Sequence, residues 1–327
     1  MTESSILAVV TAILDAHELA ETRACCDALA GAGRPSLVPG QFVYFAAFDG
    51  TNNDRANLPL SGAPLQTNVA ELFEQVETQR EGNPQLKAAY FAGVGTGAER
   101  GGFSARSSTP TPYLDKTVKA AYKDFAGEAM AWRDAHPDAQ THPLTVVVTG
   151  FSRGAGAAVA FARMLDARGF TQHGLTTSEP EKVRVAAMLL LDPVFTGIAL
   201  DLTLPSNLDG PAVVVRARDE FRYAFPAANY GSDIRVQTVE VAGNHGNIGG
   251  FYDRGIGALV LQGATGFLRA CGLLIGDVKG TRCFEPTQPV RIYNEGMDTY
   301  GNCIWKESGK RGESTRLTGE INQGPRW

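Results

Sequence analysis

A serine lies between two glycines in the heptapeptide GFSRGAG, residues 150–156, directly after the apolar run LTVVVT at residues 144–149. This order is typical of a nucleophile elbow, in which a strand turns sharply into a helix and presents a serine hydroxyl from a strained backbone conformation. The segment after the serine is rich in small residues and has the composition of a helix closed by Gly169. The sequence therefore predicts that Ser152 is a catalytic nucleophile.

A serine hydroxyl is a weak nucleophile at neutral pH, so Ser152 needs a histidine that accepts its proton and, as a rule, a carboxylate that orients the histidine. Only one of the five histidines, His245, follows the last clear strand of the sequence, in a glycine-flanked loop from which its ring can reach the elbow. The others lie on predicted helices or in other loops: His17, His136, His142 and His173. We therefore predict His245 as the base.

Two carboxylates are candidates for the acid of a triad. Asp219 follows the second strand after the nucleophile helix, where most α/β-hydrolases carry the acid, whereas Asp192 ends the first of these strands. Pro193 fixes the backbone directly after Asp192 and would hold its carboxylate at the sheet edge. Asp219 has arginine neighbours and can instead serve as an ion-pair residue or a helix N-cap. We take Asp192 as the first candidate and Asp219 as the alternative.

The loop DGTNND, residues 49–54, follows the earliest buried strand, QFVYFAAF at residues 41–48. In this architecture the loop supplies one amide of the oxyanion hole, and the residue after the nucleophile, here Arg153, supplies the other. Gly50 and Thr51 are the candidates within the loop. The clustered aspartates and asparagines also suit an Asx turn, and their spacing does not match a calcium-binding EF-hand loop, so no metal site is predicted.

Strands alternate with helices along most of the chain. This alternation predicts an α/β fold with a mostly parallel sheet, helices on both faces, and functional groups at the carboxyl ends of the strands. We expect an α/β-hydrolase catalytic domain over residues 39–275, a helical N-terminal extension over residues 1–38, and a C-terminal appendage of short strands and turns over residues 276–327. The expected strands cover residues 41–48, 88–97, 144–149, 183–192, 212–219 and 236–243, and the main helices residues 4–31, 67–79, 114–136 and 155–168.

Composition excludes several classes of function. The net charge of −5 argues against non-specific binding of nucleic acid. The five cysteines form no CxxC pair, and we expect neither a metal nor a cofactor, while a disulfide among Cys271, Cys283 and Cys303 stays open. No segment has the pattern of a secretory signal or of a membrane span. We therefore expect a protein that is cytoplasmic in its producer or leaves by a route without a cleavable signal.

Six blocks stand in order along the chain: FDGTNND at 48–54, YFAGVGTG at 90–97, GFSRGAG at 150–156, LLLDPV at 189–194, DEFRYAFP at 219–226 and NHGNIGGFYD at 244–253. They resemble the successive blocks of the DUF2235 α/β-hydrolases, a family that includes the Tle1-type phospholipase effectors of bacterial type VI secretion systems. The resemblance covers roughly residues 40–260, and it implies a Ser-Asp-His lipase or esterase with Ser152 as nucleophile and His245 as base.

The chain departs from the family pattern in two blocks. Where the family usually has His-Ser-Asp-x-Gly-Gly-Gly-Tyr, this chain has HGNIGGFY, so that Asn247 replaces the acidic residue. Where the family often has Phe/Trp-Asp-Thr-Val, this chain has LDPV. The chain is also shorter than many Tle1-type effectors and has little room for a large membrane-docking insertion. Access to lipid is therefore expected through short loops such as residues 98–112, or through the tail.

The resemblance implies an antibacterial phospholipase effector that acts on glycerophospholipid after delivery to the periplasm of a target cell. It also implies peripheral contact with a membrane, a secretion-apparatus partner and an immunity protein. The alternatives are a cytoplasmic carboxylesterase on small or polymeric esters and a catalytically silent interaction module. The intact set of serine, aspartate and histidine argues against the silent module.

Overall fold

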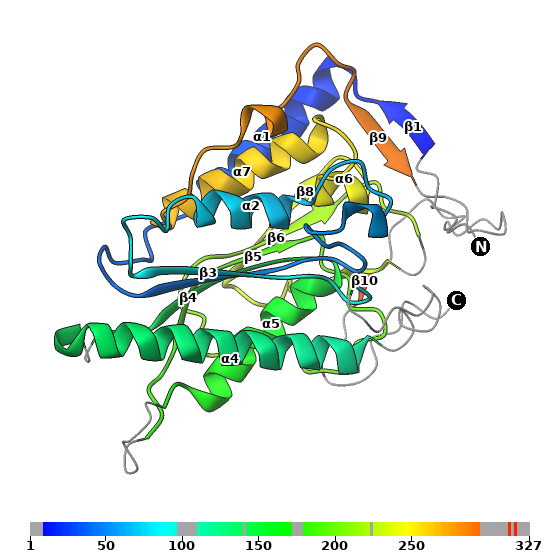
Figure 1. The fold of residues 1–327 in the computed structure, drawn as a ribbon. Coiled ribbons are helices and arrows are strands. Elements are labelled where there is room, and N and C mark those ends of the chain that lie inside the picture. The colour runs from blue at the N-terminus through cyan, green and yellow to red at the C-terminus, as the bar shows by residue number, and fades with distance from the viewer. Residues whose placement is uncertain are drawn as a thin grey trace.

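The computed structural model describes residues 9–96, 110–139, 142–171, 179–222, 225–294, 313–314 and 317–318. Its centre is a six-stranded sheet in the order β3-β2-β4-β5-β6-β8, in which every neighbouring pair is parallel (Figure 1). The predicted parallel sheet is therefore confirmed. The strands are β2 (Val43–Phe48), β3 (Leu86–Phe91), β4 (Thr145–Phe151), β5 (Arg184–Leu191), β6 (Ala212–Ala217) and β8 (Val236–Val241).

The continuous apolar runs of the sequence are the central strands. All residues of β2 and β4 are buried, because helices cover both faces of the sheet and neither face of a central strand meets solvent. Successive side chains of β2 alternate between two hydrophobic clusters: Phe45 belongs to the cluster on one face, and Tyr44 to the cluster on the other. The edge strands β3 and β8 carry partly exposed side chains instead.

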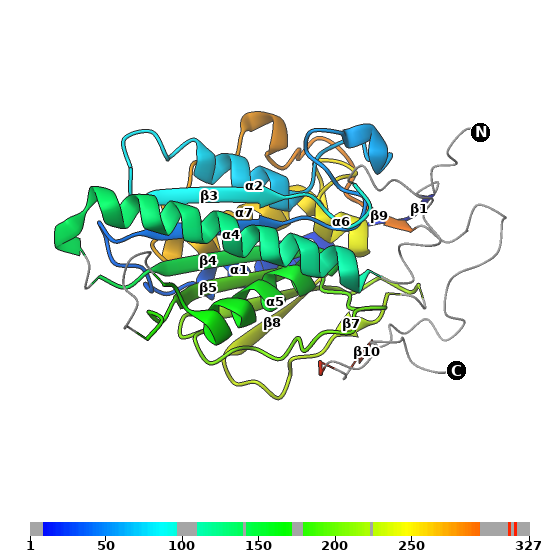
Figure 2. The ribbon, with the colours of Figure 1, turned by 60° about the horizontal axis from the view of Figure 1, so that its bottom comes forward.

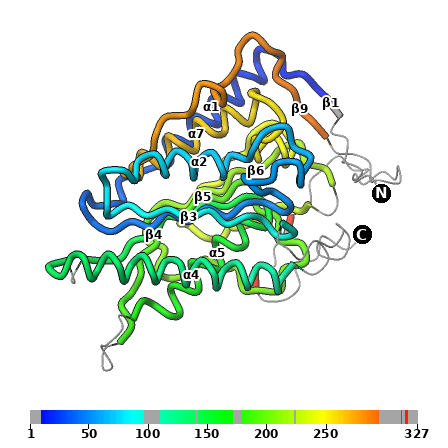
Figure 3. Tube along the Cα trace, viewed as in Figure 1, coloured from blue at the N-terminus to red at the C-terminus, as the bar shows by residue number. Residues whose placement is uncertain are grey.

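Helices α1 (Ala16–Gly31), α2 (Asn68–Glu77) and α7 (Ile256–Ala270) lie on one face of the sheet, and α4 (Thr111–Ala135) and α5 (Arg153–Arg168) lie on the other (Figures 1 and 2). The Cα trace shows the same two layers of helices (Figure 3). The short helices are η1 (Leu58–Leu60), η2 (Pro137–Ala139), α6 (His245–Gly249) and η3 (Gly280–Arg282). Among the described residues, no helix combines the length and the hydropathy that crossing a membrane requires.

Two small two-stranded sheets contain strands from the N-terminal and C-terminal parts of the chain. Strand β1 (Val9–Ile13) pairs antiparallel with β9 (Arg291–Asn294), and β7 (Ala227–Ala228) pairs parallel with β10 (Glu313–Ser314). Of the one or two helices predicted within residues 4–31, α1 is confirmed, whereas residues 9–13 form the strand β1, so the prediction is wrong there. The reason is that the strand VVTAI forms only with a partner near the other end of the chain, which local periodicity does not reveal.

The predicted extension and appendage share their core with the sheet. Leu14 and Leu29 from the N-terminal segment, and Val290 and Ile292 from the C-terminal segment, belong to the hydrophobic cluster that covers one face of the sheet. Cys271 and Cys283 are free thiols. Cys303, most of the predicted access loop over residues 98–112, and most of the tail lie outside the described residues.

Candidate active site

Ser152 lies at the turn from β4 into α5, with φ 57° and ψ −128°, a strained conformation for a residue with a side chain. Two glycines make this turn sterically possible. A Cβ at Gly150 would lie 2.5 Å from the carbonyl oxygen of Gly154, and a Cβ at Gly154 would lie 2.3 Å from the carbonyl oxygen of Asp49. Ser152 thus adopts the conformation that a nucleophile elbow requires, next to the end of β2.

His245 begins the short helix α6, and its Nδ1 is 2.6 Å from Oδ2 of Asp192. The other carboxylate oxygen of Asp192 accepts a hydrogen bond of 2.8 Å from the amide of Ala217. Asp192 is fully buried and follows β5 with φ 38°. Because the carboxylate accepts from the ring, Nδ1 carries the hydrogen and Nε2 can accept a proton.

The alternative acid, Asp219, has a different environment. Its Oδ2 accepts a hydrogen bond of 2.7 Å from the amide of Gly243, and its own amide donates to the Gly243 carbonyl over 2.9 Å. Its Oδ1 lies 3.5 Å from Nε of Arg218. These contacts tie the end of β6 to the turn before α6, and it is the carboxylate of Asp192 that pairs with the ring of His245.

A buried ion pair lies beside His245, and it was not predicted from the sequence. Glu220 is fully buried and pairs through Oε2 with Nη2 of Arg222 at 2.7 Å, while the same oxygen accepts from the amide of His245 at 3.2 Å. The Arg222 guanidinium lies 3.6 Å from the centroid of the Phe225 ring, which meets the His245 ring edge-on at 5.0 Å. The Phe151 ring lies 4.5 Å from the His245 ring. The only sequence signal was the pair of opposite charges two residues apart after an apolar strand.

The loop over residues 49–54 is organised by Asp49. Its carboxylate accepts hydrogen bonds from the amide of Gly50 at 2.7 Å, from Oγ1 of Thr67 at 2.8 Å and from the hydroxyl of Tyr90 at 2.6 Å. Burial raises the pKa of Asp49 to about 6. Of the two predicted oxyanion amides in this loop, that of Gly50 is therefore already paired, which leaves Thr51 as the candidate.

The same loop packs directly on the elbow. Nη1 of Arg153 donates to Oγ1 of Thr51 over 3.2 Å, and its Nε donates to the carbonyl of Thr196 over 3.0 Å. Burial lowers the pKa of Arg153 to about 10. A Cβ at Gly50 would lie 2.5 Å from the Phe151 ring, so the loop can approach this closely only with glycine there. The two predicted sources of oxyanion amides, Thr51 and Arg153, are thus neighbours.

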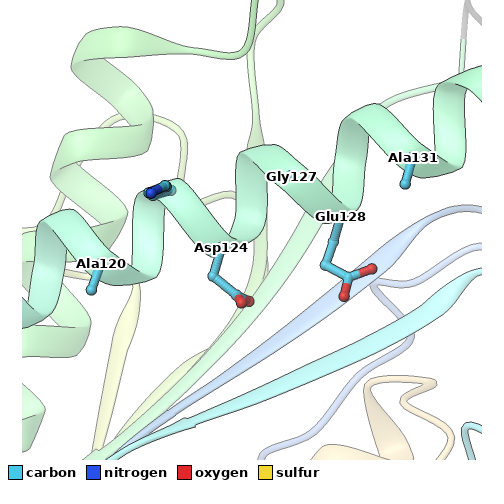
Figure 4. Close-up of a pocket in the computed structure, with 6 residues that line it drawn as sticks. Ala120, Asp124, Gly127, Glu128 and Ala131 are labelled. Atoms are coloured by element: carbon cyan, nitrogen blue, oxygen red, sulfur yellow. The ribbon is translucent and has the colours of Figure 1, made fainter.

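Two hollows among the described residues differ in size and position. A cavity of about 10 Å³, room for one water, lies behind the loop and is lined by Phe48, Asp49, Phe91, Ala92, Gly93, Val94, Leu114, Thr117, Arg153, Gly154 and Ala157. A larger open hollow of about 460 Å³ follows α4, between Ala120 and Ala131 (Figure 4). It contains none of the predicted site residues. Within the described part of the chain, no group of three or more His, Cys, Asp or Glu side chains could hold a metal.

The strand order and the strained serine between β4 and α5 define an α/β-hydrolase fold, as predicted. Residues 44–188 match a family model described as the catalytic domain of Tle1-like phospholipase effectors of type VI secretion systems. This match confirms the predicted resemblance to the Tle1-type effectors. No curated protein sequence matches the chain.

Several solved structures are similar to the chain, including the following two. An uncharacterized protein from Pseudomonas aeruginosa has 16% sequence identity and a TM-score of 0.51, over 84% of this chain and 51% of its own. The Tle1 effector bound to the VgrG spike of the type VI secretion system has 16% identity and a TM-score of 0.36, over 68% of this chain and 52% of its own. The chain thus spans about half the length of each of these proteins, and the first of them supports the fold alone.

Proposed function

We propose that the chain is a serine hydrolase of lipid esters, in which Ser152, His245 and Asp192 form the catalytic triad. The hydrogen bond of 2.6 Å between His245 and Asp192 carries this proposal. The amide of Ser152 donates to the carbonyl of Leu191 over 3.1 Å, so the nucleophile and the acid stand at the ends of two neighbouring strands. The buried carboxylate holds an imidazole whose ring lies 4.5 Å from that of Phe151, the residue directly before the strained serine, and an imidazole held in this way can activate a hydroxyl.

In the proposed mechanism, Oγ of Ser152 attacks the ester carbonyl while Nε2 of His245 takes the hydroxyl proton. Asp192 stabilises the imidazolium that forms and fixes the position of its ring. The amides of Arg153 and Thr51 donate to the oxyanion of the tetrahedral intermediate. His245 then gives its proton to the leaving alcohol. A water activated by His245 hydrolyses the acyl-enzyme and releases the carboxylic acid of the substrate.

The match to the Tle1-like catalytic domain supports glycerophospholipid as the substrate class and a role as an antibacterial effector. On this proposal the chain associates with a component of a type VI secretion apparatus and acts on the membrane of the target cell. An immunity protein would protect the producer. No nucleic acid, metal or cofactor takes part.

A phospholipase assay on purified protein tests the proposal. Vesicles of phosphatidylethanolamine and phosphatidylglycerol are incubated with the wild type and with Ser152→Ala, and lysophospholipid and free fatty acid are measured by mass spectrometry. We expect release by the wild type and a loss of about 10⁴-fold or more in Ser152→Ala, with an unchanged circular dichroism spectrum. Equal release by the two proteins would contradict the nucleophile assignment, and hydrolysis of nitrophenyl acetate without release from vesicles would favour a carboxylesterase.

A second assay tests the proposed site of action. The chain is fused to a Sec signal and expressed in a bacterial host, beside the same chain without the signal. We expect the exported chain to arrest growth and raise lysophospholipid, because it meets the outer leaflet of the inner membrane, and Ser152→Ala and His245→Ala to relieve both effects. Equal growth of the wild type and the Ser152→Ala strain under export would argue against the effector role.

A further inference from the structure

Asn247 lies inside the helix that presents His245, and its side chain is 2% exposed. Its side-chain Oδ1 accepts from the backbone amide of Asn244 at 3.2 Å, and the backbone amide of Asn247 donates to Oδ1 of Asn244 at 2.9 Å. This reciprocal pair closes the first turn of α6. A helix of five residues has too few internal hydrogen bonds to be stable alone, so its position depends on such contacts.

The side-chain amide group of Asn247 also binds the backbone of β9. Oδ1 of Asn247 accepts from the amide of Tyr293 at 3.1 Å, and Nδ2 donates to the carbonyl of Arg291 at 3.1 Å. In an extended strand the carbonyl of one residue and the amide of the second residue after it point to the same side. The Asn247 side chain thus completes one edge of β9 as a neighbouring strand would.

The other edge of β9 faces β1. The carbonyl of Val290 accepts from the amide of Leu14 at 2.9 Å, and Val290 and Ile292 pack into the core. Strand β9 is therefore held between β1 and α6, and Figures 1 and 2 show β9 beside the end of the sheet that carries α6. The Tyr252 ring, which lies 4.6 Å from the Tyr293 ring, and Asp253, whose Oδ2 accepts from the Tyr293 hydroxyl at 2.9 Å, add further contacts between β9 and the segment that follows α6.

We propose that Asn247 is a positioning residue that couples β9 to His245, so that the placement of the catalytic ring depends on a segment close to the end of the chain. The proposal rests on the proposed function, because it assumes that His245 is the base. His245 and Asn247 are two residues apart in α6, so a change in the position of this helix at Asn247 also changes the position of His245. A displacement of about 1 Å at a catalytic group can lower the rate by about 100-fold.

The chemistry of the contact requires an amide. A carboxylate at position 247 could still accept from Asn244 and Tyr293, but it would set a charged oxygen against the carbonyl of Arg291, where Nδ2 now donates at 3.1 Å. A protonated carboxyl group, in contrast, has a hydroxyl that can donate to this carbonyl. Burial favours the protonated form. The link should therefore fail in an Asn247→Asp variant at alkaline pH and return at acid pH.

The experiment compares kcat/KM for nitrophenyl acetate in Asn247→Asp and in the wild type between pH 5 and pH 8. We expect a loss of at least about tenfold in the variant at pH 8, carried by kcat, and a ratio of variant to wild type that rises as the pH falls. The charged groups on the segments around α6 include Asp192, Asp219, Glu220, Arg222, Asp253, Arg282 and Arg291. The Asn247→Ala variant adds no charge, so its ratio to the wild type measures the pH dependence that these groups cause.

Two further variants keep the test decisive. Asn247→Ala removes the link at every pH, and we expect a similar loss in kcat without the recovery at acid pH. Leu29→Ala truncates a fully buried side chain of α1 and changes neither α6 nor β9, and we expect less than about a threefold change in kcat at a temperature where it is folded. If Asn247→Asp is unfolded at pH 8 by circular dichroism, Asn247→Ala decides the question.

Folded Asn247 variants with a kcat within about threefold of the wild type would overturn the inference, as would an equal loss of kcat in Leu29→Ala. These outcomes differ from a failure of the proposed function. In that case the wild type itself would hydrolyse no ester, or the Ser152→Ala variant would retain its activity.

Discussion

Ser152 and Asp192 stand at the ends of the adjacent strands β4 and β5, and both have positive φ angles, 57° and 38°. Asn52 is the only other non-glycine residue with a positive φ among the described residues. Such conformations cost on the order of 1–3 kcal/mol each and persist where the surrounding structure imposes them. Two of them in neighbouring positions, one carrying a hydroxyl and one a carboxylate bound to a histidine, coincide with the proposed site of chemistry.

The two acid candidates give opposite expectations for variants. In Asp192→Asn, the side-chain amide can keep the contact with Ala217 but would turn its NH₂ group toward Nδ1 of His245, which favours the wrong tautomer. We expect kcat to fall by up to about 10⁴-fold, with a small change in stability. In Asp219→Asn, the amide oxygen can still accept from the Gly243 amide but lacks the charge that strengthens this hydrogen bond, so the free energy of unfolding should fall by about 1 kcal/mol or less and most of kcat should remain. Steady-state kinetics and urea unfolding of both variants measure this, and the reverse pattern would assign the acid to Asp219.

The buried pair of Glu220 and Arg222 should show strong coupling. Arg222→Met leaves the Glu220 carboxylate buried without its cation, and we expect a loss of about 3–5 kcal/mol in the free energy of unfolding. The double variant Glu220→Gln, Arg222→Met removes both charges, and we expect it to regain a large part of that loss. Urea unfolding of the two single variants and the double variant provides the measurement. Additive losses would show that the two side chains do not depend on each other.

Asp49 should make the stability of the protein depend on pH in an unusual direction. Its pKa is about 6 in the folded protein against an ordinary value of 3.8, so the folded state holds the proton more tightly. Its contribution to the free energy of unfolding is thus largest below about pH 4, falls as the pH rises to about 6, and is then constant, with a total change on the order of 3 kcal/mol.

An Asp49→Asn variant isolates this effect. Since asparagine does not titrate, the free energy of unfolding of the variant minus that of the wild type should rise between pH 4 and pH 6 and level off above. Urea unfolding at half-unit steps of pH gives this difference. A difference that stays constant across the range would mean that Asp49 titrates at its ordinary pKa.

The sequence allowed a good prediction of the sheet, because the strands that carry the site are buried on both faces and appear as unbroken apolar runs, such as the one before Ser152. The elbow was predictable because a serine between glycines after an apolar run is typical of this turn. The contact that Gly150 relieves is local, whereas Gly154 relieves a contact with the end of β2. The pairing of the Gly50 amide with Asp49 was not predictable, because an aspartate before a glycine is compatible with several turns.

Long-range contacts account for the rest. The strand at residues 9–13 was expected to be helical because its partner, β9, lies near the other end of the chain. The role of Asn247 depends on the same strand. Glu220 reaches the amide of His245 across 25 positions of sequence, and nothing in the local pattern of either residue indicates that they meet. Local propensity identifies the helices and strands. The tertiary contacts that hold His245 come from segments far apart in the sequence, and no local pattern shows that these segments meet.

A steric test of the elbow uses two glycines with opposite surroundings. An added methyl group at Gly154 would lie 2.3 Å from the carbonyl oxygen of Asp49 and 2.4 Å from that of Phe48, which are backbone atoms that cannot turn away. We expect Gly154→Ala to lower the free energy of unfolding by about 1–3 kcal/mol. Because the shift moves the loop that holds Thr51, kcat should fall as well.

Gly127 is the matched control, because it lies within α4 and an added methyl group there meets nothing within 4 Å. Gly127→Ala should raise the free energy of unfolding by about 0.5–1 kcal/mol, since alanine favours the helix and restricts the unfolded chain, and it should leave kcat unchanged. Urea unfolding and ester hydrolysis of both variants check the pair of expectations. If Gly154→Ala were as stable and as active as Gly127→Ala, the end of β2 and the start of α5 could not be packed as closely as the structure has them, and the proposed oxyanion hole between Thr51 and Arg153 would lose its support.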